Sequence, residues 1–310
     1  MFNFCTLFNK NYLDRGLALH HSLIESCDES FTLYIYPFDQ YTYDYLTLKK
    51  LKNVIIVAQS QFENQALLNV KMLRTSQEYC WTCTPSIIKF TIEHYRLDHC
   101  TYIDADLFFY KSPKILLDEI KINDAILITE HDYYAPYDQS QTSGIYCVQF
   151  IMFKNNNKGM LALNWWVDKC IEWCFCRFED NKFGDQKYLD DWPERFEGVH
   201  VLNRKEEALA PWNIQKYTKN ELKEFQVFFH FHSVKQIKPF QFYIGGYKIP
   251  RNAIDKLYVP YLIQLYKNRK ILKNEGIILE VELQPDRLFL MKNRIKALWG
   301  IHNLINIPDA

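Results

Sequence analysis

Asp104 and Asp106 stand two residues apart inside an apolar run over residues 100–110. The run is rich in aromatic and β-branched residues, which predicts a buried strand, and alternate side chains of a strand face the same side. Two carboxylates at the end of a buried strand repel each other and are costly to desolvate. A divalent cation with oxygen ligands relieves both problems. The pair therefore indicates a metal site, and the alternative is a polar turn after a core strand.

A second polar group follows a dense apolar run over 225–231. His230 and His232 end this run, and Lys235 and Lys238 follow shortly after. One imidazole nitrogen added to two carboxylates makes a mixed site that suits Mn²⁺ better than Ca²⁺, with Mg²⁺ as the other candidate. The two histidines would point the same way in a strand, and the alternative is a structural histidine pair at a sheet edge. The two lysines are candidates for binding a diphosphate, since ammonium groups bind phosphate as point charges; the alternative is that they are ordinary solvated lysines.

The first 60 residues predict the framework that positions these groups. Strands are predicted over 2–8, 31–36 and 54–57, with helices over 13–26 and 42–51 between them. This alternation is typical of a parallel sheet in an α/β fold, whose ligands gather at the carboxyl ends of the strands. Residues 9–12 and the aspartate pair both fall at such ends. The sequence therefore places both groups where a ligand is expected.

The later chain continues the alternation and then changes in character. Helices are predicted over 61–98, with a restart after Pro85, and over 159–178, and strands over 125–129 and 144–153. Beyond about residue 250 the chain becomes helical and more basic. We therefore place a catalytic domain over 1–250 and a helical C-terminal extension over 251–310.

The predicted extension carries an apolar stripe. Its members are Leu262, Leu265, Tyr266, Ile271 and Leu272, with Trp299 further on. Such a stripe either packs on the catalytic core or rests on the anionic inner face of a membrane, where lipid-linked acceptors are assembled. We favour packing on the core for most of it.

Composition excludes several classes of function. The chain has 310 residues, 37 basic and 37 acidic side chains, and a formal net charge of 0. This balance removes a general electrostatic argument for nucleic-acid binding. The N-terminus lacks the features of a signal peptide, and no window approaches 18 apolar residues. We therefore expect a cytoplasmic protein, with peripheral contact at the inner membrane as an additional option.

The nine cysteines form an odd count and do not resemble a secreted disulfide framework. Cys80 and Cys83 have Cys-x2-Cys spacing, and Cys170, Cys174 and Cys176 cluster further on. A structural zinc site drawing on both groups is conceivable. Both groups lie in apolar, tryptophan-rich contexts, so we favour buried free thiols that pack as small apolar side chains.

Four motifs in a fixed order resemble those of the retaining GT-A glycosyltransferases of family 8. Residues 232–240 (HSVKQIKPF) resemble the His-x5-Lys-Pro-aromatic signature of that family, and residues 183–189 (FGDQKYL) resemble its Asp-Gln-x-x-Leu segment. Asn11-Tyr12 matches its early Asn-Tyr, and residues 102–106 match its Asp-x-Asp strand. The resemblance spans about residues 3–240. The likeness is closer to uncharacterised bacterial nucleotide-diphospho-sugar transferases.

The resemblance implies a GT-A fold, α/β with a central mixed and mostly parallel sheet flanked by helices. It implies metal-dependent transfer of a sugar from a nucleotide-diphosphate donor to an acceptor hydroxyl, with retention at the anomeric carbon. UDP-sugar is the default donor. A bacterial surface glycan, as in lipopolysaccharide or capsule synthesis, or a lipid-linked glycan is the default acceptor. The rival functions are a sugar-nucleotide hydrolase and a non-catalytic nucleotide- or glycan-binding protein on the same fold.

The resemblance also implies roles for individual residues. His232 becomes the third metal ligand beside Asp104 and Asp106, with His230 as its rival. Asp185 and Gln186 would lie beside the donor sugar, with Gln186 near the anomeric carbon. For Asp185 a helix N-cap is the alternative role.

The nucleotide end of the site is predicted more loosely. Thr6, Asn11 and Tyr12 would surround the base and ribose, although Lys10 replaces the acidic residue that the family has before Asn-Tyr. Arg74 could reach a phosphate or a sugar hydroxyl, or form a surface ion pair. Glu130 ends a neighbouring strand and is a candidate for contact with the donor sugar or the acceptor.

Overall fold

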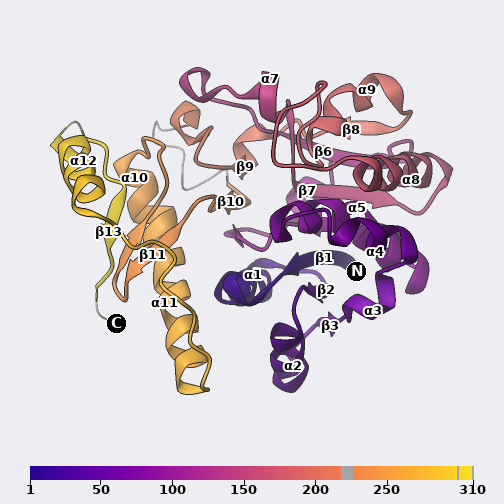
Figure 1. The fold of residues 1–310 in the computed structure, drawn as a ribbon. Coiled ribbons are helices and arrows are strands. Elements are labelled where there is room, and N and C mark those ends of the chain that lie inside the picture. The colour runs from indigo at the N-terminus through magenta and orange to yellow at the C-terminus, as the bar shows by residue number, and fades with distance from the viewer. Residues whose placement is uncertain (218–225, 299, 309–310) are drawn as a thin grey trace.

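The computed structural model describes residues 1–217, 226–298 and 300–308. Its centre is a seven-stranded sheet in the order β3-β2-β1-β4-β7-β6-β8 (Figure 1). The strands are β1 (Phe2–Phe8), β2 (Phe31–Pro37), β3 (Val54–Ile56), β4 (His99–Ile103), β6 (Ile126–Glu130), β7 (Tyr146–Lys154) and β8 (Val199–Val201). All neighbours pair in parallel except β7, which is antiparallel to both β4 and β6. The predicted mixed, mostly parallel sheet is confirmed.

Helices cover both faces of this sheet (Figure 1). The larger ones are α1 (Leu13–Ser26), α2 (Gln40–Lys49), α5 (Ser76–His94) and α8 (Asn157–Glu172), and the shorter ones are α3 (Gln59–Phe62), α4 (Gln65–Lys71), α6 (Lys114–Leu117), α7 (Ser140–Ser143) and α9 (Trp192–Arg195). Alternate residues of β1 enter two separate apolar clusters. Cys5 belongs to the cluster that contains Ile88 of α5, and Phe4 belongs to the one that contains Leu19 of α1. Burial on both faces explains why the strand sequences are apolar throughout.

Three local predictions need correction. Helix α5 continues through Pro85 instead of restarting after it, and α8 ends at Glu172 instead of residue 178. The lost backbone hydrogen bond at the proline is accepted because the helix buries a continuous apolar face. The predicted strand over 100–110 is divided into β4 and β5 (Leu107–Phe109), with a turn between them that is closed by a 3.1 Å hydrogen bond from Leu107 N to Asp104 O.

The second half of the divided strand belongs to another sheet. β5 pairs antiparallel with β10 (Phe228–His230), which pairs in parallel with β9 (Ala208–Leu209). β10 is the structured part of the apolar run predicted over 225–231, and residue 225 lies outside the described residues. This small sheet brings the histidines at the end of β10 beside the aspartates between β4 and β5.

The chain after residue 250 contains a strand as well as helices. Its elements are α10 (Arg251–Ala253), a π-helical turn (Ile254–Tyr258), α11 (Val259–Asn274), α12 (Arg287–Leu298) and β13 (Leu304–Asn306). β13 completes a three-stranded sheet with β11 (Lys235–Lys238) and β12 (Gln241–Tyr243), which precede residue 250. The division into domains at residue 250 stays a prediction.

Helix α11 packs against α1 (Figure 1). Leu262, Leu265 and Leu272 are buried, while Ile271 is exposed. Most of the predicted apolar stripe therefore packs on the rest of the protein, as we favoured, and Trp299 lies outside the described residues. Within the described part of the chain, no helix has the length and apolar character needed to cross a bilayer.

Candidate functional site

A cavity of about 620 Å³ lies at the carboxyl ends of β1 and β4. Its lining includes eight residues that the sequence singled out: Asn11, Tyr12, Asp104, Asp106, Asp185, Gln186, His230 and His232. These residues come from four distant segments of the chain. The structure therefore unites most of the predicted site in one cavity.

Asp104, Asp106 and His230 form one cluster in this cavity. Each offers a ligand atom, and these atoms all lie within 4.8 Å of one another. His230 Nε2 is 3.1 Å from Asp106 Oδ1 and 3.7 Å from Asp104 Oδ2. The aspartates meet because they flank the turn between β4 and β5, and not because they alternate along a strand. Two carboxylate oxygens and one imidazole nitrogen are a suitable set for Mn²⁺ or Mg²⁺.

The electrostatics of the cluster match that donor set. Burial alone would raise the pKa of Asp106, but His230 outweighs it by charge and hydrogen bonding and lowers the pKa to about 2. Burial is the main cause of the raised pKa of Asp104, and the neighbouring Asp106 carboxylate adds to it. Burial would lower the pKa of His230, but the Asp106 and Asp104 carboxylates raise it well above its usual value, so the imidazolium offsets part of their charge, and a divalent cation could take the place of that proton.

His232, the predicted third ligand, lies beyond the cluster. Strand β10 ends at His230, and the chain then turns, with Ser233 at φ +65°. The alternation that would point both histidines the same way therefore stops. His232 still lines the cavity, with its ring centroid 5.9 Å from that of His230. The geometry groups the rival, His230, with the aspartates.

Asp185 and Gln186 lie on another wall of the cavity. Gly184 precedes them at φ +54°, and a Cβ at this position would lie 3.2 Å from the Trp81 ring, so glycine fits where a side chain would not. The Trp166 indole donates to Asp185 O at 2.9 Å, and Gln186 Nε2 donates to Ser143 O at 2.8 Å. Burial, followed by repulsion from the Asp104 carboxylate, raises the pKa of Asp185 to about 7.

Asp185 is not the cap of the following helix. The N-cap position of the short 3₁₀ helix Lys187–Asp191 is Gln186, and its side chain makes no capping hydrogen bond. Asp185 is therefore not at the N-cap position, although its carboxyl group accepts a hydrogen bond from the backbone N–H of Gln186, as the alternative role requires, and it also lines the cavity.

The end of the cavity that the sequence predicted to hold the nucleotide is formed by a 3₁₀ helix, Lys10–Tyr12, that follows β1. Asn9 caps it by accepting a hydrogen bond from Asn11 N at 3.0 Å. The Arg15 guanidinium stacks on the Tyr12 ring at 4.6 Å from its centroid and donates to Asn11 O at 3.3 Å. Both predicted residues are therefore held in place from α1.

Known proteins resemble this chain in sequence and in structure. No protein-family model matches it. Uncharacterized protein YfnD of Bacillus subtilis (strain 168) is 29% identical over 281 residues, which are 85% of this chain and 88% of YfnD. Uncharacterized protein YfnF of the same organism is 32% identical over 223 residues, which are 69% of this chain and 73% of YfnF. The chain belongs to the YfnF family.

Three solved structures share the fold of this YfnF-family protein. Galactosyltransferase LgtC, in complex with donor and acceptor sugar analogues, has a TM-score of 0.55 and 12% identity, covering 86% of this chain and 95% of LgtC. The bifunctional glycosyltransferase WbbM has a TM-score of 0.53 and 13% identity, and the match covers 86% of this chain and 51% of WbbM. GlyE of Streptococcus pneumoniae TIGR4 has a TM-score of 0.50 and 11% identity, and the match covers 89% of this chain and 64% of GlyE. The chain therefore has the GT-A glycosyltransferase fold, which confirms the predicted resemblance to family 8.

The remaining predicted residues lie outside the lining of the cavity. Thr6 is fully buried, and its hydroxyl has no partner among the described residues. Arg74 lies in the loop before α5 with its guanidinium 3.7 Å from the Phe175 ring centroid. Glu130 pairs with Lys205 at 2.7 Å. Their roles in the YfnF-family protein stay predictions.

Lys235 and Lys238 are exposed at the two ends of β11. They follow the turn that carries His232 in sequence, and neither of them lines the cavity. Their proposed contact with a diphosphate also stays a prediction.

Sequence reasoning missed an aromatic wall of the cavity. Trp212 lies edge-on to three imidazole rings, with centroids 5.3 Å from His131, 5.3 Å from His230 and 5.7 Å from His232. Tyr247 also lines the cavity. No local pattern in the sequence around Trp212 assigned it to the site.

The favoured prediction for the two cysteine groups is confirmed in part. All nine thiols are free, and Cys83, Cys170 and Cys174 are buried, while Cys80 is half-buried and Cys176 is exposed. Burial raises the pKa of Cys80 to about 12. Within the described residues, no group of cysteines lies close enough to share a metal ion.

Proposed function

We propose that this YfnF-family protein is a metal-dependent glycosyltransferase that moves a sugar from a nucleotide-diphosphate donor to an acceptor hydroxyl. One observation carries the proposal. A single cavity on a GT-A fold combines the Asp104–Asp106–His230 cluster with Asp185 and Gln186. A metal cluster beside a buried, protonatable carboxyl group is the arrangement that diphosphate departure and sugar binding require.

Mn²⁺ or Mg²⁺ held by the cluster would supply Lewis-acid stabilisation of the departing diphosphate. Asn11 and Tyr12 bind the nucleoside at the other end of the cavity. Lys235 and Lys238 are our candidates for charge contacts with the diphosphate, because their exposed ammonium groups follow the turn after the histidines.

We further propose that the configuration at the anomeric carbon is retained. Gln186 is neutral and therefore a poor nucleophile. Its amide is tied to Ser143 O, so it can orient the sugar without reacting with it. The acceptor would then attack on the same face as the departing diphosphate, which accepts the acceptor proton. Asp185 binds a sugar hydroxyl beside it.

The proposed donor and acceptor are based on proteins that resemble this chain in fold or in sequence. LgtC is a galactosyltransferase, and its structure holds donor and acceptor sugar analogues. YfnF and YfnD are bacterial. We therefore propose a UDP-hexose as donor and a bacterial surface glycan or its lipid-linked precursor as acceptor.

A thermal-shift screen tests this function. Nucleoside diphosphates and sugar nucleotides are added with and without Mn²⁺ to the wild type and to Asp106→Asn. Binding stabilises the folded state by mass action, so the donor should raise the melting temperature by several degrees only with metal and only in the wild type. A flat response to every nucleotide would overturn the proposal.

Product analysis separates the rival functions. Incubation of the best ligand with Mn²⁺ and candidate glycans should give a glycosylated product. Release of free sugar that is unaffected by any acceptor would identify a hydrolase. Tight metal-dependent binding with no turnover would identify a binding protein.

Helix α12 supports a further proposal, peripheral contact with the inner face of the membrane by a cytoplasmic protein. Leu288, Met291 and Ile295 are about half exposed, at 53%, 53% and 49%, and their spacing places them on one face. The helix contains four basic residues and no acidic one: Arg287, Lys292, Arg294 and Lys296. An apolar face with flanking cations is typical of helices that lie on anionic lipid.

Vesicle flotation tests the membrane contact. The wild type should float with phosphatidylglycerol-containing vesicles at low salt, and the double variant Leu288→Ser/Met291→Ser should float at least several-fold less. Equal flotation of both proteins, or none of the wild type, would contradict the contact.

A further inference from the structure

Gln149 is a buried amide in the middle of the central sheet. It lies in β7, whose neighbours on both sides along the chain are apolar, and it has no exposed surface. Its side chain points to the metal cluster, where Gln149 Oε1 lies 2.7 Å from His230 Nδ1. Its backbone oxygen accepts a hydrogen bond from Asp104 N at 3.0 Å. One residue therefore contacts two members of the cluster.

The hydrogen bond to Nδ1 determines what the other ring nitrogen can do. A neutral imidazole carries its proton on one nitrogen and a lone pair on the other. With Gln149 Oε1 accepting the proton of Nδ1, the neutral ring that binds a metal carries its lone pair on Nε2. That nitrogen faces the two carboxylates, at 3.1 Å and 3.7 Å from their oxygens. The hydrogen bond to Gln149 thus orients the ring with Nε2 toward the cluster, as a metal ligand must be.

His232 has no such support. No hydrogen bond to either of its ring nitrogens is found in the described part of the chain, and its side chain is exposed. Its contacts are with aromatic rings, those of Trp212 and His230. Nothing selects the nitrogen at which His232 could bind a cation.

Packing does not explain an amide at this place. Gln149 Nε2 is buried without a partner among the described residues. An amide that is half unpaired in a protein interior is less favourable than an apolar side chain of similar size. A residue that lowers stability at a functional site is expected to have a role there.

We propose that Gln149 is a positioning residue that fixes the ring orientation and tautomer of His230, and thereby makes His230, and not His232, the histidine ligand of the metal. The inference rests on the proposed metal site and adds to it which histidine binds and what holds it. It needs no titration of the cluster, because it follows from the contacts of Gln149 alone.

Mn²⁺ binding in the absence of any nucleotide tests the inference. Free Mn²⁺ is measured by electron paramagnetic resonance as it is added to the wild type and to variants. Removal of a hydrogen bond to a metal-bound histidine typically costs 10- to 100-fold in metal affinity. We expect this loss in Gln149→Leu and a larger one in His230→Asn. We expect Gln149→Glu, which keeps an acceptor for Nδ1, to retain most of the affinity.

Two further variants sharpen the result. Gln226→Leu removes another buried glutamine that does not line the cavity, and it should bind Mn²⁺ within about twofold of the wild type. His232→Asn should also retain Mn²⁺ affinity. Loss of binding in His232→Asn, or unchanged binding in Gln149→Leu, would overturn the inference.

A second measurement does not depend on any variant folding. With wild type, ¹⁵N-labelled histidine and Zn²⁺ as a diamagnetic probe, NMR should show His230 bound through Nε2 with a slowly exchanging proton on Nδ1. Binding through Nδ1, or a shift of His232 alone, would overturn the inference. Failure of the wild type to bind Mn²⁺ would overturn the metal-dependent function, and this inference with it. Wild-type binding that Gln149→Leu leaves intact would overturn the inference alone.

Discussion

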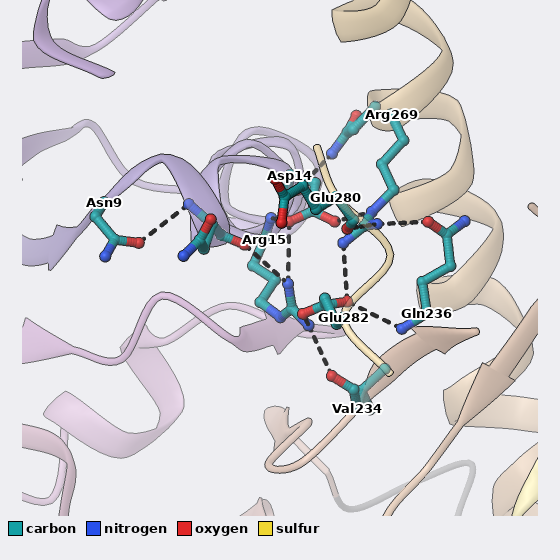
Figure 2. A network of polar contacts seen from close by, with 10 residues as sticks. Asn9, Asp14, Arg15, Val234, Gln236, Arg269, Glu280 and Glu282 are labelled. Carbon is teal, nitrogen blue, oxygen red and sulfur yellow. Dashed lines mark hydrogen bonds and ion pairs between the residues drawn. The ribbon is translucent and has the colours of Figure 1, made fainter. Parts of the chain in front are cut away.

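The Arg15 guanidinium donates a 2.7 Å hydrogen bond to the carbonyl oxygen of Val234, although 219 residues separate the two in sequence. The contact joins α1, which follows the 3₁₀ helix Lys10–Tyr12 at one end of the cavity, to the turn that follows the histidines. Glu282, in the C-terminal part of the chain, contacts Arg15 and also Gln236, two residues after Val234 (Figure 2). It accepts from Arg15 Nη2 at 2.5 Å, from Arg269 Nη2 at 2.9 Å and from Gln236 N at 2.9 Å.

Loss of the Glu282 charge should therefore destabilise the protein. Glu282→Gln leaves the two buried guanidinium groups of Arg15 and Arg269 with Asp14 as their remaining anion. Breaking one side of such a buried network typically costs several kcal/mol, and we expect about 2–3 kcal/mol because Glu282 is 20% exposed. Urea unfolding measures the loss. Glu280→Gln changes an exposed carboxylate two residues away and should lower the free energy of unfolding by under about 0.5 kcal/mol. Equal losses of stability in the two variants would show that Glu282 does not stabilise the buried guanidinium groups.

Acid should destabilise the protein through His131. Burial lowers the pKa of this histidine to about 3, against about 6.5 in an unfolded chain. Between these values the unfolded chain binds the extra proton, so the free energy of unfolding falls as the pH drops below about 6.5. The slope reaches about 1.4 kcal/mol per pH unit for one proton.

The variant His131→Gln isolates this contribution. It removes the titrating group, so its unfolding free energy should fall less steeply than that of the wild type between pH 6.5 and pH 4.5. Unfolding curves at four or five pH values measure both slopes. Parallel pH profiles would show that the ring of His131 is protonated in the folded protein.

The elements that the sequence predicted best are those whose pattern is local. Strands β1 and β2 and helix α1 were predicted to within a residue, because apolar residues recur there with a clear period and polar residues end each run. Asp185 and Gln186 were placed beside the aspartates only by resemblance to a family. Their approach depends on contacts between distant parts of the chain.

The parts that could not be predicted depend on long-range pairing. No residue near Leu107 indicates that this segment leaves the central sheet and pairs with His230, which lies far along the chain. That pairing creates the turn between the aspartates and ends the alternation at His230. The one local signal for Gln149 was an amide in an apolar strand, which chance also produces often.

Asp185 should make stability depend on pH in the opposite direction to His131. Its pKa is raised to about 7, against about 3.9 when unfolded, so the folded protein holds a proton that the unfolded chain has lost. The free energy of unfolding therefore falls as the pH rises through this window. Between pH 5.5 and pH 8 the wild type should lose about 2 kcal/mol relative to Asp185→Asn, which stays neutral throughout.

This comparison is made by urea unfolding with EDTA, so that no cation alters the cluster. Asp168→Asn removes an exposed carboxylate from α8 by the same change of atoms and is the control for the loss of one charge. The contrary outcome is that the free energies of unfolding of Asp185→Asn and the wild type differ by the same amount at every pH between 5.5 and 8. The carboxyl group of Asp185 would then be ionised in the folded protein at both pH 5.5 and pH 8.

Gly184 should be essential to the wall of the cavity that carries Asp185. Gly184→Ala adds a Cβ at φ +54° and 3.2 Å from the Trp81 ring, so it combines backbone strain with a steric overlap. Gly276→Ala is a matched control, because Gly276 has φ +82° and no atom within 4 Å of the new Cβ. Strain alone should cost Gly276→Ala about 1 kcal/mol, while Gly184→Ala should lose about 2–3 kcal/mol and also metal-dependent nucleotide binding. If the two variants have equal stability and equal nucleotide-dependent thermal shifts, then the contact with Trp81 does not hold Asp185 in place.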